Sequence, residues 1–78
     1  MTTIRLNVGR AQLVTPGDIV GKIAGVTRLP AGVVGAIDIH EDHTFADVAS
    51  AEVAFIVKKL EGLPLKDVTL APSLAPKL

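Results

Sequence analysis

The segment IDIHEDHTFADV, residues 37–48, contains both histidines of the chain and one of its two phenylalanines. The residue types in this segment, and their spacing, suit several kinds of chemistry. Two imidazoles facing each other across a hairpin could chelate a metal ion, with Asp38 or Asp42 as a third ligand. The histidines could instead belong to a catalytic group, or they could join Phe45 in a platform on which nucleic-acid bases stack. The fourth interpretation is an ordinary hairpin with the polar tip His40-Glu41-Asp42-His43.

Metal binding and catalysis have little support in the sequence. Two histidines fall short of a closed metal site, and no H-E-x-x-H motif is present. The chain has no Cys or Tyr nucleophile, and neither Ser50 nor Ser73 lies beside a histidine in a nucleophile motif. No G-x-G-x-x-G or G-x-x-x-x-G-K-[ST] motif occurs, so nucleotide binding is unsupported. We therefore expect no catalytic residue, no metal and no cofactor.

Composition limits the chain to one small domain of 78 residues. Eight basic and eight acidic residues cancel, whereas an autonomous nucleic-acid-binding domain usually carries a basic excess. This neutrality argues against strong binding by the isolated domain but leaves room for a local basic patch. No apolar run approaches the roughly 18 residues that span a bilayer. There is also no signal-peptide pattern and no cysteine, so we expect a cytoplasmic protein that does not contact a membrane.

Strand and helix patterns alternate along the chain. The first helix is expected to begin after an N-cap at Thr15 and to end at Gly25. The second helix is expected to have Ser50 as its N-cap and to end at Gly62. Strand patterns occur in four segments: Thr3–Val8, Val34–Ile39, Thr44–Val48 and Asp67–Ala71.

The resulting order βαββαβ predicts an α+β, ferredoxin-like fold. Such a fold has a four-stranded antiparallel sheet with two helices on one face. We expect the domain to span residues 1–71 and residues 72–78 to form a flexible C-terminal tail. Nothing in the chain covers the other face of the sheet, so this open face is where we expect the functional site.

The second and third strands predict which side chains reach the open face. With a two-residue tip at Glu41-Asp42, two residues lie opposite each other when their numbers add up to 83. Residues that lie opposite each other in an antiparallel ladder share a face of the sheet. The core side receives the pairs Ile39–Thr44, Ile37–Ala46 and Gly35–Val48. The open face, with residues of the first strand included, receives Arg5, Asn7, Asp38, His40, His43, Phe45 and Asp47.

Four segments together resemble a known family. IRLNVGR, TPGDIVGKIAGV, VGAIDIHEDHTFADV and KKLEGLPLKDVTL are similar, in order and spacing, to the C-terminal RNA-binding domain of DbpA-type DEAD-box RNA helicases. The resemblance covers about Ile4 to Leu70. It implies a divergent RNA recognition motif that is not catalytic itself. Such a domain anchors the helicase core of its parent chain on structured RNA, in some members a ribosomal RNA hairpin.

The resemblance also assigns roles to single residues. Phe45 falls at a base-stacking position, and Arg5 and His43 fall where ordinary RNA recognition motifs carry aromatic residues. His40 stands where relatives often have an aromatic residue. We therefore expect base contacts from Arg5, Asn7, His40, His43 and Phe45, and phosphate contacts from Arg10 and Lys66.

One departure from the family pattern leaves two alternatives open. Family members commonly carry Lys/Arg clusters after the first strand and around the last one, but here only Arg10, Lys66 and Lys77 remain. At about 0.5–1 kcal/mol for each lost phosphate contact, the loss of several contacts weakens binding by tens- to hundreds-fold. The alternatives are a protein-interaction module that uses the same open face, and a regulatory domain that binds a small ligand. Steep salt dependence would distinguish phosphate binding from apolar docking.

Overall fold

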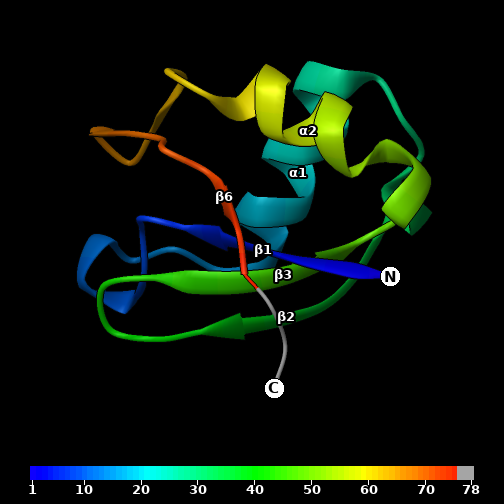
Figure 1. Ribbon diagram of the computed structural model, residues 1–78. Helices are drawn as coiled ribbons and strands as arrows, with labels where there is room; N and C mark the ends of the chain where they lie inside the picture. Colours follow the sequence, from blue (N-terminus) through cyan, green and yellow to red (C-terminus); the bar gives the residue numbers. More distant parts are fainter. Residues whose placement is uncertain (76–78) are drawn as a thin grey trace.

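A computed structural model describes residues 1–75 and shows a four-stranded antiparallel sheet with two helices packed against it (Figure 1). The predicted α+β class and the four-stranded antiparallel sheet are confirmed. In chain order the elements are β1 (Thr2–Leu6), η1 (Arg10–Gln12), α1 (Pro16–Thr27), η2 (Ala31–Val33), β2 (Val34–Ile39), β3 (Thr44–Val48), η3 (Ser50–Glu52), α2 (Val53–Leu60), β4 (Pro64–Leu65), β5 (Val68–Thr69) and β6 (Ser73–Leu74), where η marks a short 3₁₀ turn.

The segment after α2 differs from the prediction. Gly62, at φ 80°, follows the helix end as expected. Lys66 and Asp67 then also take left-handed backbone, at φ 51° and 65°, so the chain turns back and β5 pairs with β4 in a separate small hairpin. A strand does form inside the predicted segment 67–71, but it spans only Val68–Thr69 and pairs with β4, so the prediction that it is the fourth strand of the main sheet is wrong.

The fourth strand of the main sheet is β6, in the order β2-β3-β1-β6. Ser73 and Leu74, which the sequence assigns to a tail, pair with β1 instead, and the Ala75 N–H donates to the Thr3 carbonyl at 3.0 Å. Because β4 and β5 precede the strand that joins the sheet, the ferredoxin-like βαββαβ order is not confirmed. Residues 76–78 of the expected tail lie outside the described residues.

The core lies between the sheet and the two helices. Alternate residues of β3 are buried, and in β1 Ile4 and Leu6 are buried on the same side of the sheet. Thr3, on the other face of β1, is buried too. Full burial of a side chain the size of Ile or Leu contributes about 1.5–3 kcal/mol to the stability of the fold. This burial holds both helices on one face of the sheet, as Figure 1 shows. The residues of this core include Ile4 and Leu6 of β1, Ile19 and Ile23 of α1, Ala46 and Val48 of β3, and Ile56 and Leu60 of α2.

Helix α1 begins where the sequence predicts. The Thr15 hydroxyl accepts a hydrogen bond from the Asp18 N–H at 3.2 Å, and the Asp18 carboxylate accepts one from the Thr15 N–H at 3.0 Å. Pro16 occupies the first helical position, where its missing N–H removes no bond. This reciprocal capping satisfies donors that a helix start otherwise leaves unpaired.

The predicted end of α1 and start of α2 are both wrong. Helix α1 continues past Gly25 to Thr27, which is buried and donates its hydroxyl to a carbonyl one turn earlier at 2.6 Å; Arg28 then ends the helix at φ 59°. Ser50 is not the N-cap of α2, because it begins the 3₁₀ turn η3 and its hydroxyl shares a 2.7 Å hydrogen bond with the Thr2 hydroxyl. Neither difference moves residues of the open face.

Candidate nucleic-acid interface

The hairpin between β2 and β3 has the predicted register next to its tip. The His40 N–H donates to the His43 carbonyl at 2.8 Å, which makes Glu41-Asp42 a two-residue tip. Asp38 lies opposite Phe45, as predicted. Both histidines, Asp38 and Phe45 therefore share the open face.

Farther from the tip the register shifts by a bulge between Val34 and Ile37. Val48 pairs with Val34, so the predicted Gly35–Val48 pair is wrong. A Cβ on Gly35 would lie 2.5 Å from the Met1 sulfur, which shows how closely the N-terminus approaches this glycine. Glycine has no side chain to resist such an approach, and bulges are common at such positions.

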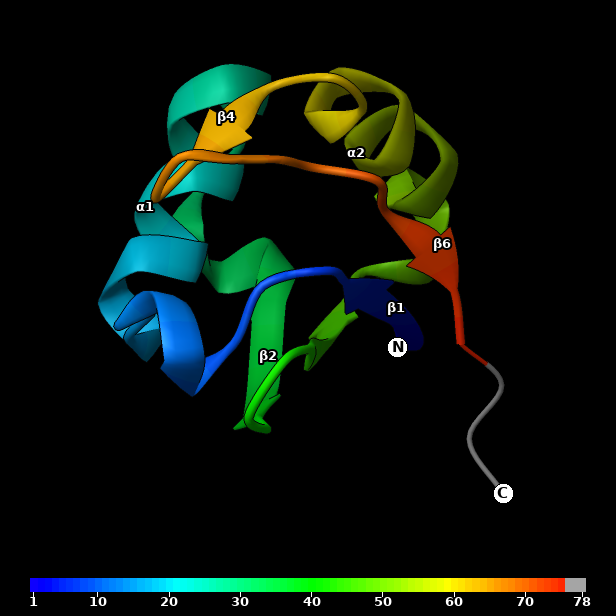
Figure 2. The same cartoon turned by 90° about the vertical axis from the view of Figure 1, so that its left-hand side faces the viewer.

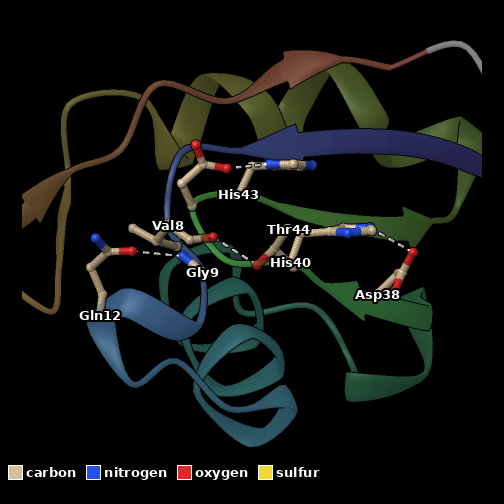
Figure 3. A network of polar contacts seen from close by, with 8 residues as sticks. Val8, Gly9, Gln12, Asp38, His40, His43 and Thr44 are labelled. Carbon is tan, nitrogen blue, oxygen red and sulfur yellow. Dashed lines mark hydrogen bonds and ion pairs between the residues drawn. The ribbon is translucent and has the colours of Figure 1, made fainter.

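Three rings meet on the open face and are called here the ring cluster: His40, His43 and Phe45. The two imidazoles stack with centroids 4.7 Å apart and planes 11° from parallel. Phe45 meets His40 and His43 edge-on, at 5.5 and 5.1 Å. Figure 3 shows the two histidine rings side by side in front of the strands. All three rings are partly exposed, so the cluster is both preorganised and accessible.

Each histidine is oriented by a carboxylate. The Nε2 of His40 lies 2.8 Å from an Asp38 oxygen, and the Nδ1 of His43 lies 2.6 Å from an Asp42 oxygen. The hydrogen bond from His43, with a smaller contribution from the charge of Arg5, holds the pKa of the Asp42 carboxyl below its ordinary value. The two carboxylates therefore orient the rings and at the same time make this face acidic.

The turn η1 packs against the hairpin tip through backbone groups. The Arg10 N–H donates to the His40 carbonyl at 2.8 Å, and the Ala11 N–H donates to the Glu41 carbonyl at 2.9 Å. Gly9 permits this approach, because a Cβ there would lie only 2.3 Å from the His40 carbonyl oxygen. The contact places the backbone of the exposed Arg10 next to His40, a residue of the ring cluster. The sequence did not reveal this role of Gly9. The signal that could have indicated it is a glycine placed directly after a strand.

Two side chains stabilise the same junction, as Figure 3 shows. The Gln12 carbonyl oxygen accepts a hydrogen bond from the Gly9 N–H at 2.8 Å. The buried Thr44 hydroxyl donates to the Val8 carbonyl at 2.7 Å. The first bond closes the turn on itself, and the second ties the chain just before the turn to β3.

The expected site residues divide into two groups. The Asn7 amide donates to the Thr69 carbonyl at 2.9 Å and accepts from the Ala71 N–H at 2.7 Å, so it holds the chain between β5 and β6. Lys66 lies 3.6 Å from the Asp18 carboxylate, and Figure 2 shows β4 beside α1. RNA contacts by Asn7 and Lys66 stay predictions. The open face and the adjoining turn bring together Arg5, Arg10, His40, His43 and Phe45, with Arg5 opposite Phe45 on the neighbouring strand.

Within residues 1–75, no group of three or more His, Cys, Asp or Glu side chains is arranged to hold a metal ion. No helix in the same range is long and apolar enough to cross a membrane. A shallow groove lies between α2 and Leu74 of β6, where its lining is mostly apolar. The ring cluster is not part of that groove.

Comparison with protein families gives a match to the family described as DbpA RNA binding domain, over residues 3–71. Comparison with curated proteins gives no significant match. The family match includes β1 to β5, the ring cluster and the Arg10 turn. A family defined by RNA binding is not itself catalytic, and its partner is RNA. Because the match covers most of the sequence, the chain belongs to the DbpA RNA-binding domain family.

Proposed function

We propose that this domain is the RNA anchor of a cytoplasmic, ATP-dependent DEAD-box RNA helicase. In this proposal the helicase core belongs to the same parent chain, and the RNA is structured and ribosomal. The observation that carries the proposal is the ring cluster on the open face, with Arg5 on the neighbouring strand and Arg10 at the hairpin tip. The family match supplies RNA as the ligand.

The ring cluster suits unpaired bases better than a duplex. Bases that are splayed out of an RNA loop or flank stack on aromatic side chains and on guanidinium planes. Each stacked base contributes about 1–3 kcal/mol. Phe45 and the histidines would hold one or two bases, while Arg10 at the edge of the face would contact the adjoining phosphate. The helicase core would then act on the duplex next to this single strand.

The charge of the open face makes the isolated domain a weak binder. Asp38 and Asp42 stand beside the rings with side-chain exposures of 72% and 81%. They repel phosphate, so the backbone of a bound strand should pass near Arg5 and Arg10 and away from the carboxylates. This acidity also favours the second candidate, a protein-interaction module in which a basic partner covers the same face.

Salt dependence distinguishes the two candidates. The probe is a labelled RNA hairpin with a single-stranded flank, titrated with the domain and followed by fluorescence anisotropy. With two phosphate contacts, affinity should fall about seven- to twelvefold between about 50 and about 200 mM salt. The double variant Arg5→Gln/Arg10→Gln should lose most of this dependence. The control Lys58→Gln/Lys59→Gln, on the exposed end of α2, should retain it.

Absence of binding at the lower salt would contradict the RNA proposal and favour a protein partner. Equal effects of the two double variants would show that the open face is not the phosphate-binding surface.

A further inference from the structure

Leu13 is an exposed apolar residue in a strained backbone conformation. It follows η1 with φ 60° and ψ 32°, in the left-handed region, and 78% of it is exposed to solvent. Residues other than glycine are disfavoured there, and asparagine and aspartate tolerate it best. Leucine has neither advantage, and at this exposure its side chain contributes little to the core.

Hydrogen bonds on both sides hold this conformation. The Leu13 N–H donates to the Arg10 carbonyl at 2.9 Å, and the Val14 N–H donates to the Gly9 carbonyl at 3.4 Å. Gly9 and Arg10 are themselves tied to Gln12 and to the hairpin tip. Val14 is buried in the core, which fixes the other side of Leu13. The leucine side chain is thus presented at a defined place, one turn from Arg10.

The other left-handed residues have local explanations. Arg28 ends α1, and Lys66 with Asp67 forms the turn of the β4–β5 hairpin. Leu13 ends η1 in the same way that Arg28 ends α1, with its N–H bonded to the Arg10 carbonyl. The difference lies in the side chain, because Arg28, Lys66 and Asp67 are polar and suit exposed turns. Leu13 alone among the described non-glycine residues combines a left-handed backbone with an exposed apolar side chain.

We infer that Leu13 is an RNA-contacting residue and that the Arg10–Leu13 turn extends the interface of the ring cluster. Arg10 contacts a phosphate, and Leu13 packs against the ribose or base next to it. The inference rests on the proposed function. Nucleic acid is the occupant because the turn carries an apolar side chain and a cation, its backbone is bonded to His40 of the ring cluster, and the family match gives RNA as the ligand. Strained backbone that contributes nothing to the core is a recurring feature of binding sites.

The test is the variant Leu13→Asn in the 78-residue chain, with the RNA hairpin and flank as probe. Asparagine accepts the left-handed backbone and removes the apolar contact, so Tm should rise by about 4–8 °C. RNA affinity should fall about five- to tenfold. A higher Tm together with weaker binding separates a contact residue from a structural one. Leu13→Gly should show the same loss of affinity.

Leu74→Asn is the matched control, because Leu74 is also exposed, at 64%, but lies in β6 beside the groove along α2. It should leave RNA affinity unchanged. If the wild-type chain binds RNA and Phe45→Ala weakens the binding, while both Leu13 variants bind like wild type, this inference is overturned and the proposed function stands. If the wild-type chain does not bind the RNA at all, both are overturned.

Discussion

Phe45 meets both histidine rings edge-on, yet it lies outside the buried core between sheet and helices. Replacing it with alanine should therefore remove a stacking surface and leave the fold largely intact. Phe45→Ala should weaken RNA binding by about 1–3 kcal/mol in an anisotropy titration. Circular dichroism should show little change in thermal stability.

Phe55 provides the matched control for this substitution. It is the other phenylalanine, it lies exposed on α2, and the Lys59 ammonium stands 5.6 Å from its ring centroid. Phe55→Ala should leave RNA affinity unchanged. A large loss of stability in Phe45→Ala without any loss of binding would show that Phe45 acts in folding and not in recognition.

The histidines predict a pH dependence of binding. Histidine is the side chain whose charge ordinarily changes between pH 5 and 8, so acidification tests whether the two imidazoles of the ring cluster contact phosphate. Asp42 stays ionised in this range because its pKa is lowered by the hydrogen bond from His43. RNA affinity should therefore rise from about pH 7.5 to about pH 5.5. The double variant His40→Asn/His43→Asn should give a flat profile, whereas a flat wild-type profile would remove the histidines from the site.

At the scale of elements, the contact between η1 and the hairpin tip depends on the absence of a side chain at Gly9. An added Cβ would collide with the His40 carbonyl oxygen. Gly9→Ala should lower the free energy of unfolding by about 2 kcal/mol or more and weaken RNA binding, because Arg10 moves with the turn. Urea unfolding and anisotropy measure the two effects.

Gly21, in the middle of α1, is the control for this change. Its position is exposed and an added Cβ would meet no atom within 4 Å. Gly21→Ala should raise stability by about 0.5–1 kcal/mol and leave RNA binding unchanged. A stable, fully active Gly9→Ala variant would refute the proposed packing of η1 on the hairpin.

The cap of α1 predicts how stability responds to acid. The Thr15 N–H, assisted by the Thr15 hydroxyl and Lys66, lowers the pKa of Asp18 below its value of 3.8 in unfolded peptides. The folded state therefore binds this proton less readily than the unfolded state. The resulting stabilisation is present above pH 3.8 and disappears as the pH falls through the lower, folded pKa. Asp18→Asn should show a smaller loss of urea stability on acidification than wild type, and an equal loss would contradict this account.

The sequence predicted those parts of the fold that depend on local pattern. The alternation of β1 and β3, the α1 cap at Thr15 and the hairpin register next to Glu41-Asp42 follow from side-chain types a few residues apart. The fourth strand was misplaced because the left-handed turn at Lys66-Asp67 contains no glycine, and Asp67, its one usual turn residue, was taken as the first residue of the strand. The pairing of β6 with β1 joins residues about 70 positions apart in the chain, so local pattern could not reveal it.

For the candidate site too, the sequence predicted the part that depends on local pattern. Alternation placed Arg5, His40, His43 and Phe45 on the open face, because residue parity decides the face in a strand. It could not show that the Asn7 amide would bind the chain before β6, since that depends on where the last strand runs. Leu13 was also missed, because a left-handed leucine has no signal in the sequence.

At the scale of the whole molecule, the zero net charge is unevenly distributed. Lys22, Lys58 and Lys59 belong to the helices, which cover the opposite face of the sheet, while Asp38 and Asp42 stand beside the ring cluster. The long-range electrostatic attraction between the open face and RNA is therefore weak. Recognition depends on base stacking and on Arg5 and Arg10. We expect the isolated domain to bind RNA weakly. In the proposed parent helicase the binding should be tighter, since linked sites raise the effective concentration.

The most direct test of the RNA interface is an NMR titration of the ¹⁵N-labelled domain with the RNA hairpin and its single-stranded flank, at low and at physiological salt. We predict shifts at Arg5, Arg10, His40, His43 and Phe45 that shrink as salt rises, with little change along α2. The absence of shifts at low salt, or shifts concentrated on α2 instead of the open face, would contradict the proposed interface.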